Sequence, residues 1–215
     1  DTTLTADHEQ ARGAGSESAT SRVGIRSAPW TGGQVSSTLE QQSSENGERL
    51  FATTGLKQSW QVTSRWTADA GLDRAATIRE SPGYTMNVNV PAASGSTEDF
   101  TAVFAGLGYR ADAWSWTGRV EHRQSESEDK VSLFSGANGE VHSGLALAAG
   151  LQTFRTVNVS GATRFNGDLR LGAAYRPRET RIIVLDRFDY LVTEVRGADL
   201  PYENWRVVNN LVLNY

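Results

Sequence analysis

The feature that most constrains this chain is an alternation of apolar and polar side chains with a period of two, which recurs in segments of about ten residues. The stretch WRVVNNLVLNY at 205–215 is one example. One of its rows reads Trp205, Val207, Asn209, Leu211, Leu213 and Tyr215, and the other reads Arg206, Val208, Asn210, Val212 and Asn214. Successive side chains of a strand point to opposite faces, so the pattern predicts β-strands. Helical periodicity is nearly absent.

Clusters of Gly, Asn, Ser, Asp and Glu separate these segments and predict turns. We predict twelve strands, at 2–11, 19–29, 34–44, 49–60, 65–79, 99–110, 114–125, 130–137, 144–156, 166–176, 181–195 and 203–215. The connections after even-numbered strands are short, and include QVTSR, ADA and NGEVHS. Those after odd-numbered strands are longer, as at 80–99, 124–129 and 156–165. Short periplasmic turns and long outer loops are typical of outer-membrane barrels.

The aromatic residues favour a membrane barrel over a soluble β-sandwich, which would also show alternating faces. If the strands run up and down, aromatic residues gather near two rims. The candidates for the membrane interface at the short-turn rim are Trp30, Trp60, Trp66, Tyr109, Trp114, Trp116, Tyr175 and Tyr215, and Trp205 is the candidate at the other rim. The group at the second rim is Phe51, Phe100, Tyr190, Tyr202 and Trp205. Rings with an N–H or O–H favour the membrane–water boundary, whereas aromatic residues of a soluble fold fill the core.

The predicted fold class is therefore all-β, an antiparallel up-and-down transmembrane β-barrel of about 12 strands in the bacterial outer membrane. We predict one domain over 1–215. The first strands fit least well, because outward rows such as Val35, Ser37, Leu39 and Gln41 are thinly apolar.

Composition excludes several other functions. The chain has no apolar run of 18 or more residues, so no membrane-spanning helix is expected. It has no cysteine, which excludes disulfides and thiolate metal sites. The net charge is −4 and no basic block is present, so nucleic acid is not an expected partner.

A row of charged residues is the main candidate site. The candidate lumen-lining residues are Asp69, Asp73, Arg119, Glu121, Arg123, Asp168, Arg170, Arg176 and Arg206. Rings of charge can select solutes. Charges of both signs can instead pair across neighbouring strands and fill or rigidify a narrow barrel, which is the interpretation that we favour.

No catalytic site is predicted. Glu121 and His122 are an acid and an imidazole, but neighbours on one strand point to opposite faces and cannot act together. His8, on a polar strand, and His142, in a predicted turn, show no metal-ligand spacing. SESED at 125–129 is a solvated loop or a cation site, and no G-x-S-x-G motif is present. We therefore expect no cofactor and no metal.

LDRFDY at 185–190 interrupts the alternation, because Asp186 is out of phase with Arg187 and Asp189. A β-bulge would resolve this, and a protein contact on the wall is the alternative.

Three stretches resemble the carboxy-terminal barrel region of large Gram-negative outer-membrane and surface proteins that carry repeat or immunoglobulin-like modules upstream. They are EDFTAVFAGLGYRADAWSWTGRVEHRQSESEDK (98–130), LRLGAAYRPRETRIIVLDRFDY (169–190) and WRVVNNLVLNY (205–215). The resemblance covers roughly 45–215 and implies location and architecture, but no chemistry. It also implies further strands of the same protein, since related chains usually continue past this last strand.

The expected function is a non-enzymatic outer-membrane barrel that anchors an upstream surface or periplasmic region, with or without a restricted pore. Its expected partners are outer-membrane lipid, lipopolysaccharide, the barrel-assembly machinery and additional strands or domains of the same protein. Three alternatives stay open: a passive channel or passenger-translocation pore, an outer-membrane hydrolase, and a soluble β-sandwich adhesin.

Overall fold

The computed structural model describes the whole chain except residues 14–15, 45–46, 83–97, 178–180, 198 and 215. The described residues form twelve strands: β1 (Thr2–Gly13), β2 (Ser16–Ser27), β3 (Gly33–Ser44), β4 (Gly47–Gln61), β5 (Trp66–Glu80), β6 (Phe100–Arg110), β7 (Trp114–Ser125), β8 (Glu128–His142), β9 (Leu145–Asn158), β10 (Thr163–Tyr175), β11 (Ile183–Arg196) and β12 (Tyr202–Asn214). No helix among the described residues has the length and apolar character needed to cross a membrane.

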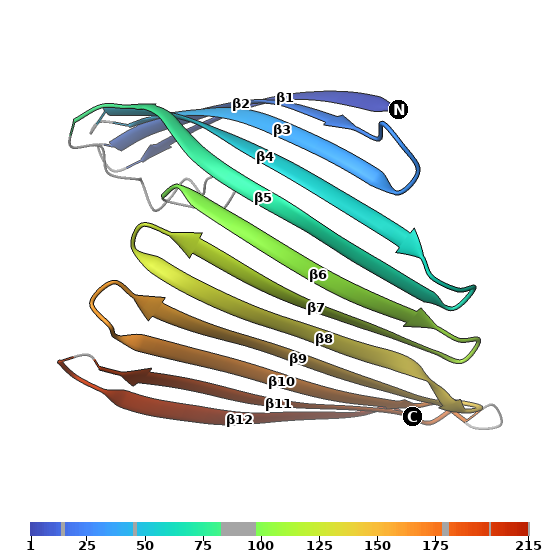
Figure 1. The fold of residues 1–215 in the computed structure, drawn as a ribbon. Coiled ribbons are helices and arrows are strands. Elements are labelled where there is room, and N and C mark those ends of the chain that lie inside the picture. The colour runs from blue at the N-terminus through green and yellow to red at the C-terminus, as the bar shows by residue number, and fades with distance from the viewer. Residues whose placement is uncertain (14–15, 45–46, 83–97, 178–180, 198, 215) are drawn as a thin grey trace. The chain divides into compact units, whose positions relative to one another are not determined.

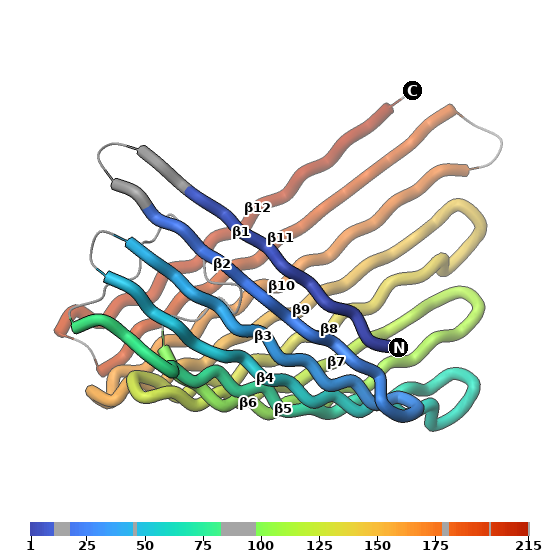
Figure 2. The backbone as a smooth tube through the Cα atoms, turned by 90° about the horizontal axis from the view of Figure 1, so that it is seen from above, coloured from blue at the N-terminus to red at the C-terminus, as the bar shows by residue number. Residues whose placement is uncertain are grey.

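The strands form one sheet in sequential order from β1 to β12 (Figure 1). Neighbouring strands such as β10 and β11 pair antiparallel, and consecutive strands of one hairpin run in opposite directions in Figure 2. The predicted all-β, antiparallel up-and-down architecture is confirmed. A sandwich would need two stacked sheets, whereas the described strands belong to a single one.

The strand positions agree with the prediction to within a few residues at most ends, but β8 does not end at residue 137 as predicted. It continues to His142, so NGEVHS is mostly strand and His142 does not lie in a turn. The reason lies at Gly139, where an added β-carbon would be 2.4 Å from the β-carbon of Trp114. This glycine allows the backbone at Ala113 and Trp114 to approach closely and does not form a turn.

Two further expectations about the connections and strands are wrong. The connection after β7 shrinks to 126–127 and the one after β9 to 159–162, so the predicted difference between short and long ends is not general. In addition, β11 has no bulge at LDRFDY, since its register is continuous with β10 and with β12.

The chain packs as two compact units. Unit 1 comprises Asp1–Ser59, Ala70–Val103 and Arg123–Glu126, and unit 2 comprises Trp60–Asp69, Phe104–His122 and Ser127–Tyr215. The prediction of a single domain over 1–215 stays a prediction.

Few apolar side chains are buried among the described residues: Phe51, Ala75, Ala102, Phe104 and Val195. Large apolar side chains are exposed instead, including Trp205 at 63% and Leu213 at 68%. A water-soluble domain of this size buries most residues of this kind in its core. The sheet therefore presents to its surroundings the side chains that a soluble domain would hide.

Candidate functional site

Unit 2 separates charge and apolar surface on two faces of its strands. In β8 to β12 the register aligns three rows of side chains on what we call the charged face of unit 2: Phe134–Gln152–Asp168–Leu191–Arg206, Gly136–Gly150–Arg170–Asp189–Val208 and Asn138–Ala148–Gly172–Arg187–Asn210. The hydrogen bond from Ser115 to Asn138 places the odd-numbered residues of β7, such as Arg119, on the same face. The alternate residues form the reverse face of unit 2.

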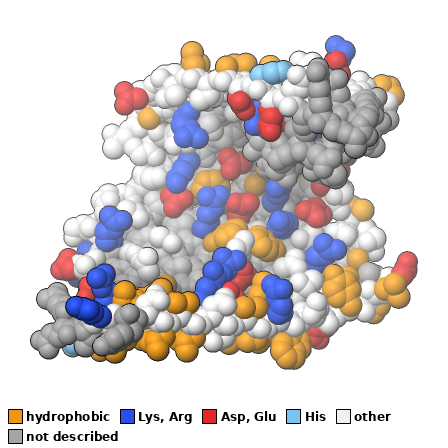
Figure 3. Space-filling view, turned by 180° about the vertical axis from the view of Figure 1, so that it is seen from behind, with side chains coloured by type: hydrophobic (Ala, Val, Ile, Leu, Met, Phe, Trp, Pro, Cys, Tyr) orange, Lys and Arg blue, Asp and Glu red, His pale blue; other side chains and the backbone are white. Residues whose placement is uncertain are grey.

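The ion pairs on the charged face of unit 2 join residues two apart on one strand. Arg119 lies 2.8 Å from Glu121, and Arg187 lies 2.9 Å from Asp189. Asp168 and Arg170 form a third pair, in which Arg170 Nε donates to Asp168 Oδ1 at 3.1 Å. The favoured prediction of pairing across neighbouring strands is therefore wrong for these residues, because side chains at i and i+2 already share a face. Figure 3 shows acidic and basic side chains mixed on one face of the molecule.

The reverse face of unit 2 carries a cluster of four aromatic residues where β5, β6 and β7 meet their turns. The ring centroids of Trp66 and Tyr109 are 4.8 Å apart, and those of Tyr109 and Trp114 are 4.7 Å apart. Trp116 lies 6.3 Å from Trp66, and its indole N–H donates to Ser135 Oγ at 3.0 Å. The sequence therefore located correctly four residues that the fold brings together at one end of these strands.

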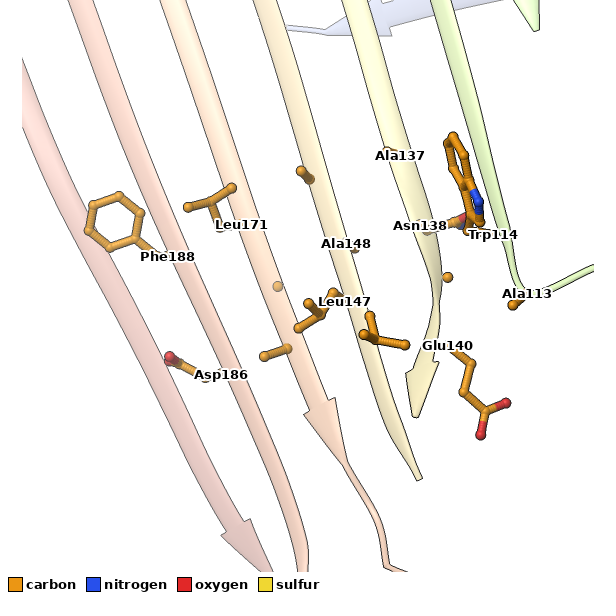
Figure 4. A pocket seen from close by; sticks show the side chains of 15 residues that line it. Ala113, Trp114, Ala137, Asn138, Glu140, Leu147, Ala148, Leu171, Asp186 and Phe188 are labelled. Carbon is orange, nitrogen blue, oxygen red and sulfur yellow. The ribbon is translucent and has the colours of Figure 1, made fainter. Parts of the chain in front are cut away.

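Next to this cluster, the reverse face is hollowed over about 750 Å³ between Trp114 and Phe188 (Figure 4). Leu147, Leu171 and small residues line the hollow. Asp186 lies at its edge and accepts a hydrogen bond from the Asn209 amide at 2.8 Å. The lining is mostly apolar, with Asn138, Glu140 and Asp186 as its polar members. The register also resolves the phase of LDRFDY: Asp186 lies on the reverse face, while Arg187 and Asp189 lie on the charged face.

Unit 1 has a charged face of its own, with ion pairs between strands. Arg22 of β2 lies 3.2 Å from Asp7 of β1 and 3.2 Å from Glu40 of β3. Arg49 of β4 is only 2% exposed. It donates to Thr77 at 2.8 Å and forms ion pairs with Glu80 at 3.5 Å and with Asp99 at 3.3 Å. Glu80 ends β5, and Asp99 immediately precedes β6. These pairs join different strands or their ends, but they involve residues outside the predicted lumen-lining row.

The reverse face of unit 1 is mixed in polarity. On β1 to β3 it holds Leu4, His8, Ser21, Val23, Ile25, Val35, Ser37, Leu39 and Gln41. The contact of His8 Nδ1 with Ser21 Oγ at 2.9 Å identifies this face. The thinly apolar outward rows predicted for the first strands are therefore present in the structure.

Two predicted aspartates are accommodated by glycines on the charged faces. In unit 1, a β-carbon added at Gly55 would lie 2.6 Å from Asp73 Oδ1, and in unit 2 one added at Gly106 would lie 2.6 Å from Asp69 Oδ1. Both distances are far below van der Waals contact, so each carboxylate occupies the space that glycine leaves. Asp69 and Asp73 thus belong to the charged faces, as predicted by their position in β5.

The remaining predicted charged residues differ in placement. Arg123 lies on the charged face of unit 1, with its guanidinium 3.6 Å above the ring of Phe100. Arg206 lies on the charged face of unit 2, opposite Leu191. Arg176 follows the end of β10, where its backbone N–H donates to the Gly144 carbonyl at 2.7 Å, so it is not part of the strand row predicted for 166–176.

The other predicted interface aromatics within the described residues lie near strand ends or in a turn. Trp30 lies in the turn before β3 and donates its indole N–H to Gln58 Oε1 at 2.6 Å. Trp60 and Tyr175 are exposed near the ends of β4 and β10, and Trp205 is exposed near the start of β12. Tyr215 lies outside the described residues.

The second aromatic belt predicted from the sequence is largely wrong. Phe51 and Phe100 lie on the charged face of unit 1, under Arg49 and Arg123. Tyr202 is opposite Val195, on the charged face of unit 2. Only Tyr190 and Trp205 lie on the reverse face. The prediction used the level of each ring along its strand and ignored which face it occupies.

Sequence reasoning also missed the cation–π pairs of the charged faces. Arg119 lies 3.7 Å above the ring of Phe104, and Lys130 lies 4.7 Å from the ring of Phe154. Such contacts stabilise a cation against an aromatic ring. A signal in the sequence exists only for Arg49 and Phe51, which follow each other in one alternating row of β4. Arg187 and Asp189 were also missed as members of the charged face, because their row depends on the register.

No catalytic arrangement is visible among the described residues. Glu121 is held by Arg119, while His122 occupies the alternate position of β7 and is exposed. This agrees with the prediction that the two side chains point to opposite faces. Within the described part of the chain, no three His, Asp or Glu side chains are grouped in a way that could hold a metal ion.

No protein-family model matches the chain, and no curated protein is significantly similar to it. Among solved structures, the KdgM porin is similar over 97% of this chain and 96% of its own, at 10% identity and a TM-score of 0.43. A structure of OccD1 (OprD) is similar over 96% of this chain and 68% of its own, at 10% identity and a TM-score of 0.49. The outer membrane protein OmpT of Vibrio cholerae is similar over 99% and 97%, at 9% identity and a TM-score of 0.41.

Proposed function

We propose that this chain forms the wall of a bacterial outer-membrane β-barrel of about twelve strands. The support comes from the sheet itself: its strands run up and down in sequential order, which is the connectivity of barrels of this type. In hydrocarbon every backbone N–H and C=O needs a partner within the protein, and a closed antiparallel sheet provides one.

The single observation that carries the proposal is the contrast between the two faces of unit 2. The reverse face has exposed Leu and Val side chains and an aromatic cluster at the turns, while the charged face holds guanidinium–carboxylate pairs. Lipid favours the first surface and water the second, and the indole and phenol groups suit the boundary between them. We therefore place the reverse face against lipid.

The wall serves as a non-enzymatic anchor for an upstream surface or periplasmic region of the same protein. Its partners are outer-membrane lipid and lipopolysaccharide, the barrel-assembly machinery during insertion, and additional strands or domains of that protein. The resemblance of 98–130, 169–190 and 205–215 to carboxy-terminal barrel regions supports this role. The separation of Glu121 from His122 supports a role without hydrolysis.

A test of the wall compares folding in lipid and in water. We expect the refolded protein to insert into liposomes, and its tryptophan emission to be quenched by lipids brominated near the headgroup. Trp66, Trp114, Trp116 and Trp205 all lie on the reverse face, so replacing these four by Phe should remove most of the quenching. A monodisperse folded protein in buffer without detergent would contradict the proposal.

A passive channel is the second candidate function. It is favoured by exposed guanidinium groups on the charged face, where the Arg170 and Arg187 side chains are each 57% exposed. Stable conductance steps in a planar bilayer, altered by Arg119→Gln, would support it. Insertion without conductance would leave the anchor as the function.

A further inference from the structure

The charged face of unit 2 contains a recess in which two arginines stand beside small residues. Two adjoining hollows of about 380 and 280 Å³ share Gly136, Gly150 and Arg170 in their linings. Arg187, Asn138 and Gly172 line the larger one. Every residue named here lies on β8, β9, β10 or β11 of unit 2.

The recess exists because each arginine has a glycine as its direct neighbour across the ladder. Arg170 is opposite Gly150, and Arg187 is opposite Gly172. A β-carbon added at Gly150 would meet nothing within 4 Å, and one added at Gly172 would only touch Ala148 at 3.7 Å. The space beside both guanidinium groups is therefore open.

The four charges at this recess are not equally accessible. The Arg170 and Arg187 side chains are each 57% exposed, whereas Asp168 and Asp189 are 18% and 11% exposed. The carboxylates are shielded and the guanidiniums cover them. A solute that enters the recess thus meets N–H donors first, although the quartet is formally neutral.

The shielded aspartates also fix the arginines in place. Arg170 Nε donates to Asp168 Oδ1 at 3.1 Å, and Arg187 Nε donates to Asp189 Oδ1 at 3.0 Å. Arg170 is also the direct cross-strand neighbour of Asp189, so Arg170 and Arg187 are diagonal neighbours, about 7 Å apart at their backbones.

A guanidinium held through one edge keeps further N–H groups for an oxyanion, and its planar fork matches a carboxylate.

From this geometry we propose that Arg170 and Arg187, above the floor of Gly136, Gly150 and Gly172, form a binding site for the carboxylate groups of a small solute. Asn138 and Gln152 flank the recess and supply amide donors and acceptors for the rest of the solute. This binding site is a function in addition to anchoring. It rests on the proposed function in one respect only, namely that the charged face is in contact with water.

The test uses the full chain in detergent micelles and citrate as the probe, measured by equilibrium dialysis at low ionic strength. We expect saturable binding that weakens as salt rises, because salt screens exposed charges. Arg187→Gln combined with Asp189→Asn removes one guanidinium without changing the net charge, and should weaken binding at least tenfold. Gly150→Leu keeps every charge, fills the recess, and should weaken binding to a similar extent.

Arg155→Gln is the matched control, since Arg155 lies on the reverse face of β9, opposite Val131 and Phe165. It should bind citrate like the original chain. Circular dichroism in the same micelles checks that each variant keeps its β-structure. If Gly150→Leu fails to fold, Gly150→Ser fills the recess less and should weaken binding by a smaller factor.

Absence of saturable citrate binding by the folded chain would overturn the proposal, as would equal binding by the original chain and the Arg187→Gln/Asp189→Asn variant. Dialysis needs no bilayer. Failure of liposome insertion would therefore contradict the proposed wall alone, and failure of citrate binding would contradict this site alone.

Discussion

The two units differ more on their reverse faces than on their charged faces. On unit 2 the reverse face combines exposed Leu and Val side chains with four aromatic rings in contact. On β1 to β3 of unit 1 the same kind of face places Leu4, Val23 and Leu39 among serine, glutamine and histidine. Both units, in contrast, hold arginine–carboxylate pairs and cation–π contacts on their charged faces.

This difference teaches that alternation alone does not define a lipid-facing surface. A period of two makes a strand with two faces, whereas contact with hydrocarbon also needs one face to be apolar along its whole length. Unit 2 comes closer to that condition, with Arg155, Asp186 and the Glu194–Arg196 pair as its charged exceptions, than β1 to β3 do. We therefore assign the main contact with the hydrocarbon core to unit 2.

The largest expected effect separates these two reverse faces. Leu151→Arg on β9 places a charge on the apolar face of unit 2 and should cost about 2–4 kcal/mol, as for arginine near the bilayer midplane. Leu39→Arg on β3 is the matched change in unit 1, at a similarly exposed leucine beside Ser37 and Gln41. It should cost less than about 1 kcal/mol. Denaturant unfolding in lipid measures the loss of stability of both variants. Equal losses would contradict the difference between the two reverse faces.

The second prediction compares one cation from each charged face. Arg49→Met removes a side chain that is 2% exposed and holds Thr77, Glu80 and Asp99 together, so we expect a loss of about 2 kcal/mol. This is below the cost of breaking a fully buried pair, because Glu80 and Asp99 are almost half exposed and can regain water.

Arg119→Met is its counterpart in unit 2. Arg119 is 38% exposed and pairs with Glu121, so its loss should cost less than about 1 kcal/mol. The same unfolding titration applies. If Arg119→Met lowered the free energy of unfolding more than Arg49→Met, the burial of an ion pair would not determine how much it contributes to stability.

The smallest expected effect tests whether the charged faces are alike. Gly55→Ala in unit 1 and Gly106→Ala in unit 2 both place a β-carbon 2.6 Å from an aspartate oxygen. Each carboxylate must move, and each change should lower stability by about 1 kcal/mol. Gly150→Ala is the control, since its β-carbon meets nothing within 4 Å. A clearly unequal response of Gly55 and Gly106 would extend the difference between the units to their charged faces.

Much of the fold could be predicted because the apolar–polar alternation with a period of two is visible in the sequence itself and requires no knowledge of tertiary contacts. The residues of β7 and β12 follow directly from alternating rows, and the structure confirms those rows. The end of β8 could not be predicted, because Asn138–Gly139 has the composition of a turn. What overrides that signal is the close approach of the backbone at Ala113 and Trp114, at the start of the neighbouring strand β7, which needs the space at Gly139.

The candidate site was predictable in composition but not in pairing. Asp168 and Arg170 were assigned to one row correctly, and the structure adds that they pair with each other along β10. Phe51 and Phe100 were assigned to a membrane belt from their level on the strand, although they lie under arginines on the charged face. Cation–π contacts of this kind depend on register between strands, which a single sequence does not supply.

The most direct test of the account is cysteine accessibility along β10, since the chain contains no cysteine and each introduced thiol is unique. Single cysteines at Asp168, Leu169, Arg170 and Leu171 would be treated with a charged, membrane-impermeant maleimide in liposomes. We expect labelling at positions 168 and 170 and protection at 169 and 171, because the first two face water and the others face lipid. Equal labelling at all four positions would contradict the assignment of the reverse face of unit 2 to lipid.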